Sequence, residues 1–250
     1  MRGGARMRPV VAGLDEVAGL VARERSRRGR SPYLVAMTGG VAAGKSTLAA
    51  ALAERLTPAR VEVVTTDGFL HPNAVLAARG LTERKGFPES YDRERLVSFL
   101  GALSASETEV RAPVYSHLRY DVVPGAEQRV RDTDIVVVEG LGLLHDDDRP
   151  FFDCTVYVDA AEDDLERWFL DRMLTLRRAA ADEPDAFYHA FVAMSEGDTL
   201  SVGRAAWRLI NGANLREHIL PLRDRADIVI EKGPAHQIIA VRFSPERRDR

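Results

Sequence analysis

Short apolar runs alternate with stretches of helical periodicity along the chain. Apolar positions three and four residues apart, including Leu14, Val17 and Val21, predict a helix over residues 10–28. Runs rich in β-branched residues predict strands at residues 33–38, 61–66, 110–115, 135–140, 155–158, 228–230 and 238–243. Helical patterns predict helices at residues 46–56, 73–78, 93–103, 162–181, 187–195 and 199–210.

This alternation of strands and helices predicts an α/β fold with a doubly wound, mostly parallel sheet flanked by helices. The run at 135–138 is apolar throughout, which is typical of a parallel strand buried on both faces. Ligands of such sheets bind beyond the carboxyl ends of the strands. The informative loops, at residues 39–46, 67–72 and 139–145, fall at these ends, and the Gly- and Pro-rich stretch 67–92 is interpreted as an active-site loop.

Composition places this pattern in one domain that spans residues 1–250. The chain has 45% apolar residues and a net charge of −3, so no overall field favours nucleic acid or a membrane. Residues 1–30 form a basic N-terminal helix or arm with eight Arg against three acids. Contact of this arm with nucleic acid or anionic lipid is one reading, and a solvated amphipathic helix is the favoured one.

Cysteine content and hydropathy bear on the compartment. Cys154 is the only cysteine and opens an apolar strand pattern, so we expect it to pack in the core. No disulfide within the chain is possible, no apolar run has the length of a membrane span, and the N-terminus lacks the apolar region of a secretory signal. The sequence therefore predicts a cytoplasmic protein.

The segment MTGGVAAGKST at residues 37–47 fits the pattern G-x-x-x-x-G-K-[ST], with a predicted strand before it and a predicted helix after it. Glycines let backbone N–H groups turn towards phosphate oxygens, and the helix start adds further donors. Lys45 supplies charge to the outer phosphates, and Ser46 offers a hydroxyl to Mg²⁺. The predicted phosphate cradle consists of Gly39, Gly40, Val41, Ala42, Ala43, Gly44, Lys45, Ser46 and Thr47.

Two carboxylates follow predicted strands near this cradle. Asp67 ends the second strand, which we expect to lie one strand over from the cradle, where a small-molecule kinase places the base that accepts the acceptor's proton. The alternative is a turn Asp before Gly68. Glu139 ends the apolar strand, where it either holds Mg²⁺ through water or caps the strand end as a structural acid.

Further candidates lie in two later segments. Residues 112–125 bring Tyr115 and His117 together with Arg, Tyr and Asp between two prolines, which is an unusual setting for a structural histidine. The predicted helix at 162–181 offers several arginines, of which one can reach the transferring phosphoryl group.

Longer motifs identify a family. The segments TTDGFLHPN at 65–73, KGFPESYD at 85–92, APVYSHLRYDV at 112–122, VVVEGL at 136–141 and ILPLRDRAD at 219–227 resemble the bacterial type I pantothenate kinases. The resemblance runs from about residue 33 to about residue 243. It implies a P-loop kinase fold related to uridine kinase and phosphoribulokinase, and ATP- and Mg²⁺-dependent phosphorylation of pantothenate, the first step towards coenzyme A, in a homodimer.

The resemblance also implies roles for single residues. Lys45 and Ser46 match the phosphate and Mg²⁺ contacts, and Asp67 matches the proposed base. Tyr115 and His117 match substrate-lining positions. The remaining matches are Arg172 at the transferring phosphate, Asn211 at the pantothenate chain and His236 close to the adenine.

The chain departs from the family in its acceptor pocket. Phe169 stands where the family has a Tyr, Leu176 and Ala181 replace aromatic residues, and Ala50 replaces a basic residue linked to feedback by coenzyme A. Two alternatives therefore stay open. One is a related kinase that acts on another small hydroxyl compound, such as a nucleoside or sugar derivative. The other is a nucleotide-binding regulatory protein without transfer activity, against which the set Lys45, Asp67 and Arg172 argues.

Overall fold

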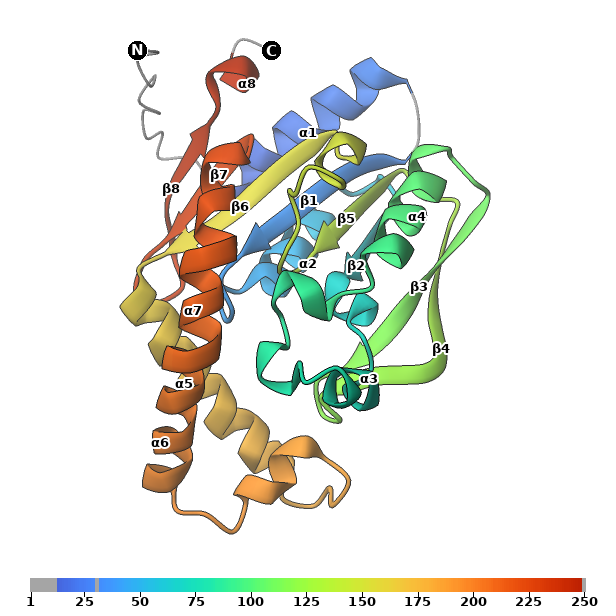
Figure 1. Cartoon of the computed structure of the whole chain (residues 1–250). Coiled ribbons are helices and arrows are strands. Elements are labelled where there is room, and N and C mark those ends of the chain that lie inside the picture. The colour runs from blue at the N-terminus through green and yellow to red at the C-terminus, as the bar shows by residue number, and fades with distance from the viewer. Residues whose placement is uncertain (1–12, 30–31, 249–250) are drawn as a thin grey trace.

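A mostly parallel sheet of six strands forms the centre of the molecule (Figure 1). The computed structural model describes residues 13–29 and 32–248. The strands follow one another across the sheet in the order β2 (Val61–Thr65), β5 (Ile135–Glu139), β1 (Tyr33–Gly39), β6 (Cys154–Ala160), β7 (Ile228–Lys232) and β8 (Ile238–Phe243). Only β8 is antiparallel to its neighbour. The predicted doubly wound, mostly parallel sheet is thus confirmed.

Burial along the strands follows the apolar pattern. All residues of β1 and β5 are buried, as expected for central parallel strands, and Cys154 lies in the core. The register places Glu139 opposite Met37 of β1 and opposite Thr65 of β2. The loops that leave these three strands therefore start at one level, at the lower side of the sheet in Figure 1.

Helices cover both faces of the sheet (Figure 1). The segment α2 packs against β1, β2 and β5, α1 packs on α2, and α5 and α6 pair with each other and extend beyond the carboxyl ends of the strands. The helices are α1 (Leu14–Arg28), α2 (Lys45–Arg55), α3 (Asn73–Ala78), α4 (Arg93–Ser104), α5 (Glu162–Ala179), α6 (Glu196–Ala206), α7 (Gly212–Asn214) and α8 (Pro245–Arg248). Among the described residues, none of the helices has both the length and the apolarity that a bilayer crossing needs.

A separate antiparallel hairpin, formed by β3 (Glu109–Ser116) and β4 (Asp121–Arg131), lies beside the main sheet. The strand predicted at 110–115 is β3, whereas β4 was not predicted. Its sequence contains Pro124 and Gly125, and most of its residues are only partly buried or exposed, so it lacks an apolar alternation.

Two predictions of helix position need correction. Residues 187–195 do not form an α-helix, because only Phe187–Phe191 make a 3-10 turn after the break at Pro184. The helix predicted at 199–210 is part of a longer helical run that continues through π-helical segments at Trp207–Asn211 and Leu215–Ile219. The start of the helix predicted from residue 10, and residues 1–12 and 30 of the basic arm, lie outside the described residues.

Candidate active site

The loop between β1 and α2 is shaped by residues with positive φ. Gly39 has φ of 148°, Ala42 of 62° and Gly44 of 82°. At Gly39 a Cβ atom would lie 2.3 Å from the backbone oxygen of Val158, so only glycine fits. The sequence thus folds this segment into a tight loop that ends at the start of α2, where unpaired backbone N–H groups favour an anion.

Lys45 folds back over this loop. Its ammonium donates to the carbonyl oxygens of Gly39 at 3.1 Å and Gly40 at 2.9 Å. Burial lowers the pKa of Lys45, and the carboxylates of Glu139 and Asp67 partly oppose this shift. The ammonium therefore lies over the predicted cradle with only carbonyl partners, and a phosphate would be a stronger one.

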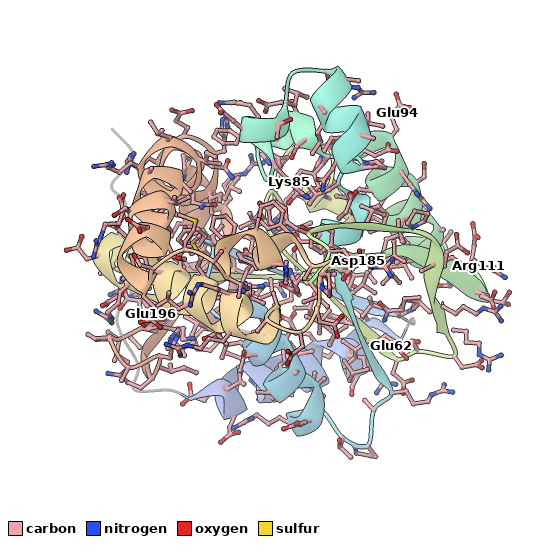
Figure 2. All side chains as sticks on the ribbon, turned by 90° about the horizontal axis from the view of Figure 1, so that it is seen from below. Glu62, Lys85, Glu94, Arg111, Asp185 and Glu196 are labelled. Carbon is pink, nitrogen blue, oxygen red and sulfur yellow. The ribbon has the colours of Figure 1, made fainter. Side chains whose placement is uncertain are left out.

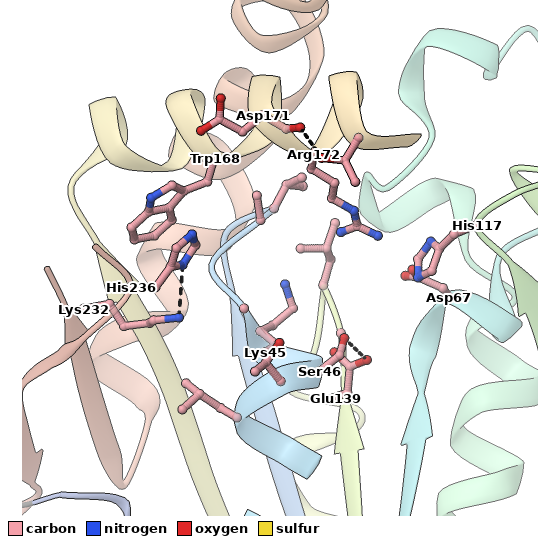
Figure 3. A pocket seen from close by; sticks show the side chains of 18 residues that line it. Lys45, Ser46, Asp67, His117, Glu139, Trp168, Asp171, Arg172, Lys232 and His236 are labelled. Atoms are coloured by element: carbon pink, nitrogen blue, oxygen red, sulfur yellow. Dashed lines mark hydrogen bonds between the residues drawn. The ribbon is translucent and has the colours of Figure 1, made fainter. Parts of the chain in front are cut away.

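Ser46 and Glu139 face each other beside Lys45. The Ser46 hydroxyl donates to Glu139 Oε1 at 2.9 Å, and the buried position of Glu139 raises its pKa (Figure 3). No group of three or more His, Cys, Asp or Glu side chains is arranged to hold a metal ion in the part of the chain that the structure describes. One hydroxyl and one carboxylate fit Mg²⁺, which is usually held by few protein ligands together with phosphates and water.

Asp67 lies in a short 3-10 turn, Thr66–Phe69, directly after β2. The Thr65 hydroxyl accepts from the Asp67 N–H at 3.3 Å, and a Cβ at Gly68 would lie 2.0 Å from the backbone oxygen of Pro113. The expectation that this strand lies next to β1 is wrong, because β5 lies between them. Asp67 still borders the same cavity as the loop after β1, since the three strands end at one level.

Two further predicted residues meet Asp67 across the cavity. His117, from the turn between β3 and β4, lies next to Asp67, and Arg172 projects from α5 towards both (Figure 3). Burial lowers the pKa of His117, Asp67 opposes this shift, and Arg172 adds to it. The site thus brings a carboxylate, an imidazole and a guanidinium from three distant parts of the chain to one side of the cavity.

The cavity that these side chains line has a volume of about 850 Å³. Most predicted site residues border it: Val41, Ala42, Gly44, Lys45, Ser46, Thr47, Asp67, His117, Glu139, Arg172 and His236. The predicted residues that do not border it are Gly39, Gly40, Ala43, Tyr115, Phe169 and Asn211. The ring of Tyr115 contacts that of His117 at 5.2 Å, and Phe169 packs against Trp207 at 5.8 Å. The roles that the sequence predicts for all of these residues, whether or not they border the cavity, stay predictions.

Two stacked aromatic rings line the opposite end of the cavity. The rings of Trp168 and His236 stack with centroids 3.7 Å apart and planes 22° apart. Lys232 lies next to them, with its ammonium 3.4 Å from His236 Nδ1 (Figure 3). Of these three residues the sequence pointed only to His236. The scarcity of lysine, with three among 35 basic residues, was the signal that would have singled out Lys232.

A second group of aromatic side chains lies near enough to Asp67 for its charge to act on Tyr120. The ring of Tyr120 stacks on Phe187 at 4.4 Å and contacts Tyr188 at 6.4 Å. The Lys85 ammonium lies 4.0 Å from the Tyr120 ring centroid and donates to the Tyr120 carbonyl oxygen at 2.5 Å. In Figure 2, which looks at this side of the molecule, Lys85 lies towards the middle, whereas Glu94, Arg111 and Glu196 lie at the rim.

No sequence pattern pointed to Lys85 as a site residue. Burial lowers its pKa to about 8, and the carboxylates of Asp121 and Asp67 oppose this shift. Asp67 is therefore close enough to act on the Lys85 charge. Like Lys232, it is one of the three lysines of the chain, and it opens the segment KGFPESYD.

Known proteins are similar to this chain in sequence. Residues 34–177 match the model of the phosphoribulokinase/uridine kinase family. A pantothenate kinase of Sorangium cellulosum is 50% identical over 224 residues, which cover 85% of this chain and 73% of that protein. A pantothenate kinase of Streptomyces avermitilis is 45% identical over 230 residues, which cover 86% of this chain and 70% of that protein.

Solved structures share the fold. A putative fructose transport system kinase from Silicibacter sp. TM1040 is 27% identical with a TM-score of 0.68, and the match covers 82% of this chain and 93% of that one. A D-glycerate 3-kinase from Cryptococcus neoformans has a TM-score of 0.62 at 13% identity, with 93% of this chain and 100% of that one covered. At that identity the likeness shows the fold alone.

Proposed function

Because the chain belongs to the phosphoribulokinase/uridine kinase family and, within it, to the pantothenate kinases, we propose that it transfers the γ-phosphoryl group of ATP to the primary hydroxyl of pantothenate, the first step of coenzyme A biosynthesis. The single observation that carries the reaction type is the convergence of Lys45, Asp67 and Arg172 on one cavity. A protein that only bound a nucleotide would not need a carboxylate and a guanidinium at the far end of the phosphate cradle.

The nucleotide runs from the Trp168–His236 stack to Lys45 in this proposal. An aromatic stack offers a planar surface for a base, and the loop before α2 offers N–H groups for phosphates. Ser46 and Glu139 would hold Mg²⁺, which neutralises charge on the outer phosphates when it is bound. This direction places the γ-phosphoryl group between Lys45 and Asp67.

Asp67 acts as the base at this end. As the acceptor's hydroxyl oxygen forms its bond to the γ-phosphorus, its proton passes to an Asp67 carboxylate oxygen. The bond from the γ-phosphorus to the bridging oxygen breaks, and that oxygen leaves on ADP. Lys45 and Arg172 offset the negative charge on the phosphoryl oxygens during transfer.

The acceptor lies among the aromatic side chains near Asp67. Tyr120 and Phe187 present apolar faces to a molecule of mixed polarity such as pantothenate, and the Lys85 ammonium supplies a donor and a charge beside them. Leu176 and Ala181 are not among the side chains that form this group. The relatives named pantothenate kinase support pantothenate over a different hydroxyl compound.

A screen of acceptors tests the proposal. Purified protein is given ATP, Mg²⁺ and one of pantothenate, uridine, ribose or glycerate, and ADP release is measured over a range of acceptor concentrations. We expect kcat/KM to be at least 100-fold higher for pantothenate than for the others. A preference for uridine or a sugar would show that pantothenate is not the main substrate. ATP binding without turnover on any acceptor would favour a regulatory protein.

We also propose a cytoplasmic homodimer. The exposed apolar side chains of Leu209 and Val202, which are 75% and 41% accessible and seven residues apart in one helical run, support an interface on this face. Light scattering on the purified chain is expected to give twice the mass of 27.6 kDa. A monomer at micromolar concentration would contradict the dimer and leave the reaction untouched.

A further inference from the structure

Lys232 ends β7, two strands away from the phosphate loop, yet its side chain reaches that loop. Its ammonium donates to the carbonyl oxygen of Ala43 at 2.9 Å. It also lies 2.7 Å from the point that a Cβ of Gly44 would occupy, so the absence of a side chain at Gly44 makes room for it. Lys232 is therefore a second lysine in direct contact with the loop that holds Lys45.

The charge of Lys232 has no acidic partner within residues 13–29 and 32–248. No ion pair joins its ammonium to a carboxylate there, although the side chain is buried. Burial lowers its pKa with no carboxylate opposing the shift, whereas Glu139 and Asp67 do so for Lys45. A buried cation without a counter-charge is costly, so its place at the edge of a cavity indicates that an anion enters there.

The position of Lys232 along the cavity indicates which phosphate of the nucleotide it would contact. Figure 3 shows Lys232 on the side of His236 and Trp168, with Lys45 between it and Asp67. If the base lies on the aromatic stack and the γ-phosphoryl group lies at Asp67, the phosphate beside Lys232 is the one attached to the nucleoside. The γ-phosphoryl group is left to Lys45 and Arg172.

The contact with Ala43 adds a second effect. In a trans peptide the C=O and N–H groups point in opposite directions. The bond from Lys232 to the Ala43 carbonyl therefore fixes the direction of the Gly44 N–H, and Gly44 lines the cavity. A compact ammonium suits a place that lies only 2.7 Å from a Cβ position at Gly44.

We infer that Lys232 is a phosphate-binding residue that contacts the α-phosphate of the nucleotide and at the same time holds the loop in its binding conformation. The inference rests on the proposed use of ATP and deepens it. It concerns binding alone, so it can be tested without any acceptor.

The test compares Lys232→Met with the unchanged protein in titrations with adenosine, AMP, ADP and ATP. Methionine keeps most of the length and removes the charge. We expect the Kd for AMP, ADP and ATP to rise by a common factor on the order of 10- to 100-fold, the size of a lost hydrogen bond to a charged group. The Kd for adenosine is expected to change less than about two-fold, which also reports that the aromatic stack is intact.

Arg167→Met is the matched control. Arg167 donates to the Pro234 carbonyl oxygen at 2.7 Å, in the loop after β7, but it does not line the cavity. Its removal takes away one positive charge from the same region and is expected to change the Kd values less than two-fold. A similar loss in both variants would mean that general charge, not contact, is responsible, and would overturn the inference.

Three other results would also overturn it. Unchanged Kd values for the nucleotides in Lys232→Met would mean that Lys232 does not contact them. An equal loss of affinity for adenosine would mean that Lys232 acts on the aromatic stack. A loss of affinity for ADP and ATP, but not for AMP, would mean that Lys232 only supports the loop. If binding depends on Lys232 as expected but pantothenate is not phosphorylated, the proposed function fails and this inference stands.

Discussion

At the scale of residues, the three lysines of the chain all lie at or near the proposed active site. Lys45 and Lys232 line the cavity, and Lys85 is close enough to Asp67 for the carboxylate to affect its pKa. The motif around Lys45 predicted its place from the sequence. Lys85 and Lys232 lie in segments with no general phosphate motif and reach the site from a loop and from the end of β7, so only the fold shows that they converge.

Replacing Asp67 by Asn tests the base. The amide keeps the shape of the carboxylate but cannot accept the hydroxyl proton, so kcat is expected to fall by about 10²- to 10⁴-fold. The Kd for ATP is expected to stay within about three-fold, because Asp67 is assigned to the acceptor. The rate of ADP release measures kcat, and a binding titration measures the Kd for ATP. Exposed Asp185→Asn is the control, and near-normal kcat in Asp67→Asn would rule out the assigned role.

The lowered pKa of Lys85 predicts a pH dependence. Lys85 is protonated below its pKa of about 8 and neutral above it, so the positive charge near Asp67 is present at low pH and lost as pH rises. We expect kcat/KM for pantothenate to fall as pH increases through about 8, and Lys85→Met to lack this fall. A wild-type profile that is flat from pH 7 to pH 9.5 would contradict the role of this charge.

At the scale of elements, periodicity located most strands and helices but not their neighbours. The order β2-β5-β1 puts the fully buried strand β5 in the middle and the partly exposed strand that contains Glu62 at the edge, which matches their burial. Strand order is set by packing between distant segments, so one-dimensional patterns put β2 next to β1, although Asp67 does border the cavity as expected. The strand β4 was missed because its sequence lacks an apolar alternation, and the π-helical segments follow α6 without a break in the helical pattern.

Gly68→Ala tests how the turn after β2 positions Asp67. A methyl group there would overlap the Pro113 carbonyl oxygen, so the turn or β3 must move. We expect a loss of about 1–3 kcal/mol in the free energy of unfolding, as for overpacked sites, and a fall in kcat at least as large as ten-fold.

Gly197→Ala is the matched control for this change. A Cβ at Gly197 meets only the Ser195 hydroxyl at 3.7 Å, near the start of α6, so alanine is expected to be neutral or stabilising by up to about 1 kcal/mol. Urea denaturation measures both variants. A Gly68→Ala protein of unchanged stability and activity would show that the close contact with Pro113 does not fix the turn.

At the scale of the whole molecule, one buried ionic cluster joins the two ends of the described chain. Arg247 of α8 donates to Glu24 of α1, to the Asp153 carbonyl oxygen and, at 3.2 Å, to Asp227 Oδ2. The Tyr33 hydroxyl also donates to Glu24, at 2.5 Å. The C-terminal segment is thus attached to α1 and to the start of β7 on the core that carries the site.

Arg247→Met is expected to remove this cation from Glu24, whereas Asp227 keeps its ion pair with Arg149 at 3.3 Å. The Arg247 side chain is only 11% exposed, so the loss is that of a buried pair, about 3–5 kcal/mol in the free energy of unfolding. Arg55→Met, whose partner Asp15 is 86% exposed, should cost less than about 1 kcal/mol. Denaturation in urea measures the free energy of unfolding of both variants. Equal losses would mean that the buried cluster contributes no more to stability than an exposed ion pair.

The most direct test of the central claim is the identity of the product. The protein is incubated with ATP, Mg²⁺ and pantothenate, and the mixture is followed by ³¹P NMR and mass spectrometry. We expect one phosphorylated pantothenate, esterified at its primary hydroxyl, for each ADP formed, and at least about 100-fold slower product formation with Asp67→Asn. ADP formed together with inorganic phosphate, or with pantothenate left unmodified, would contradict that claim.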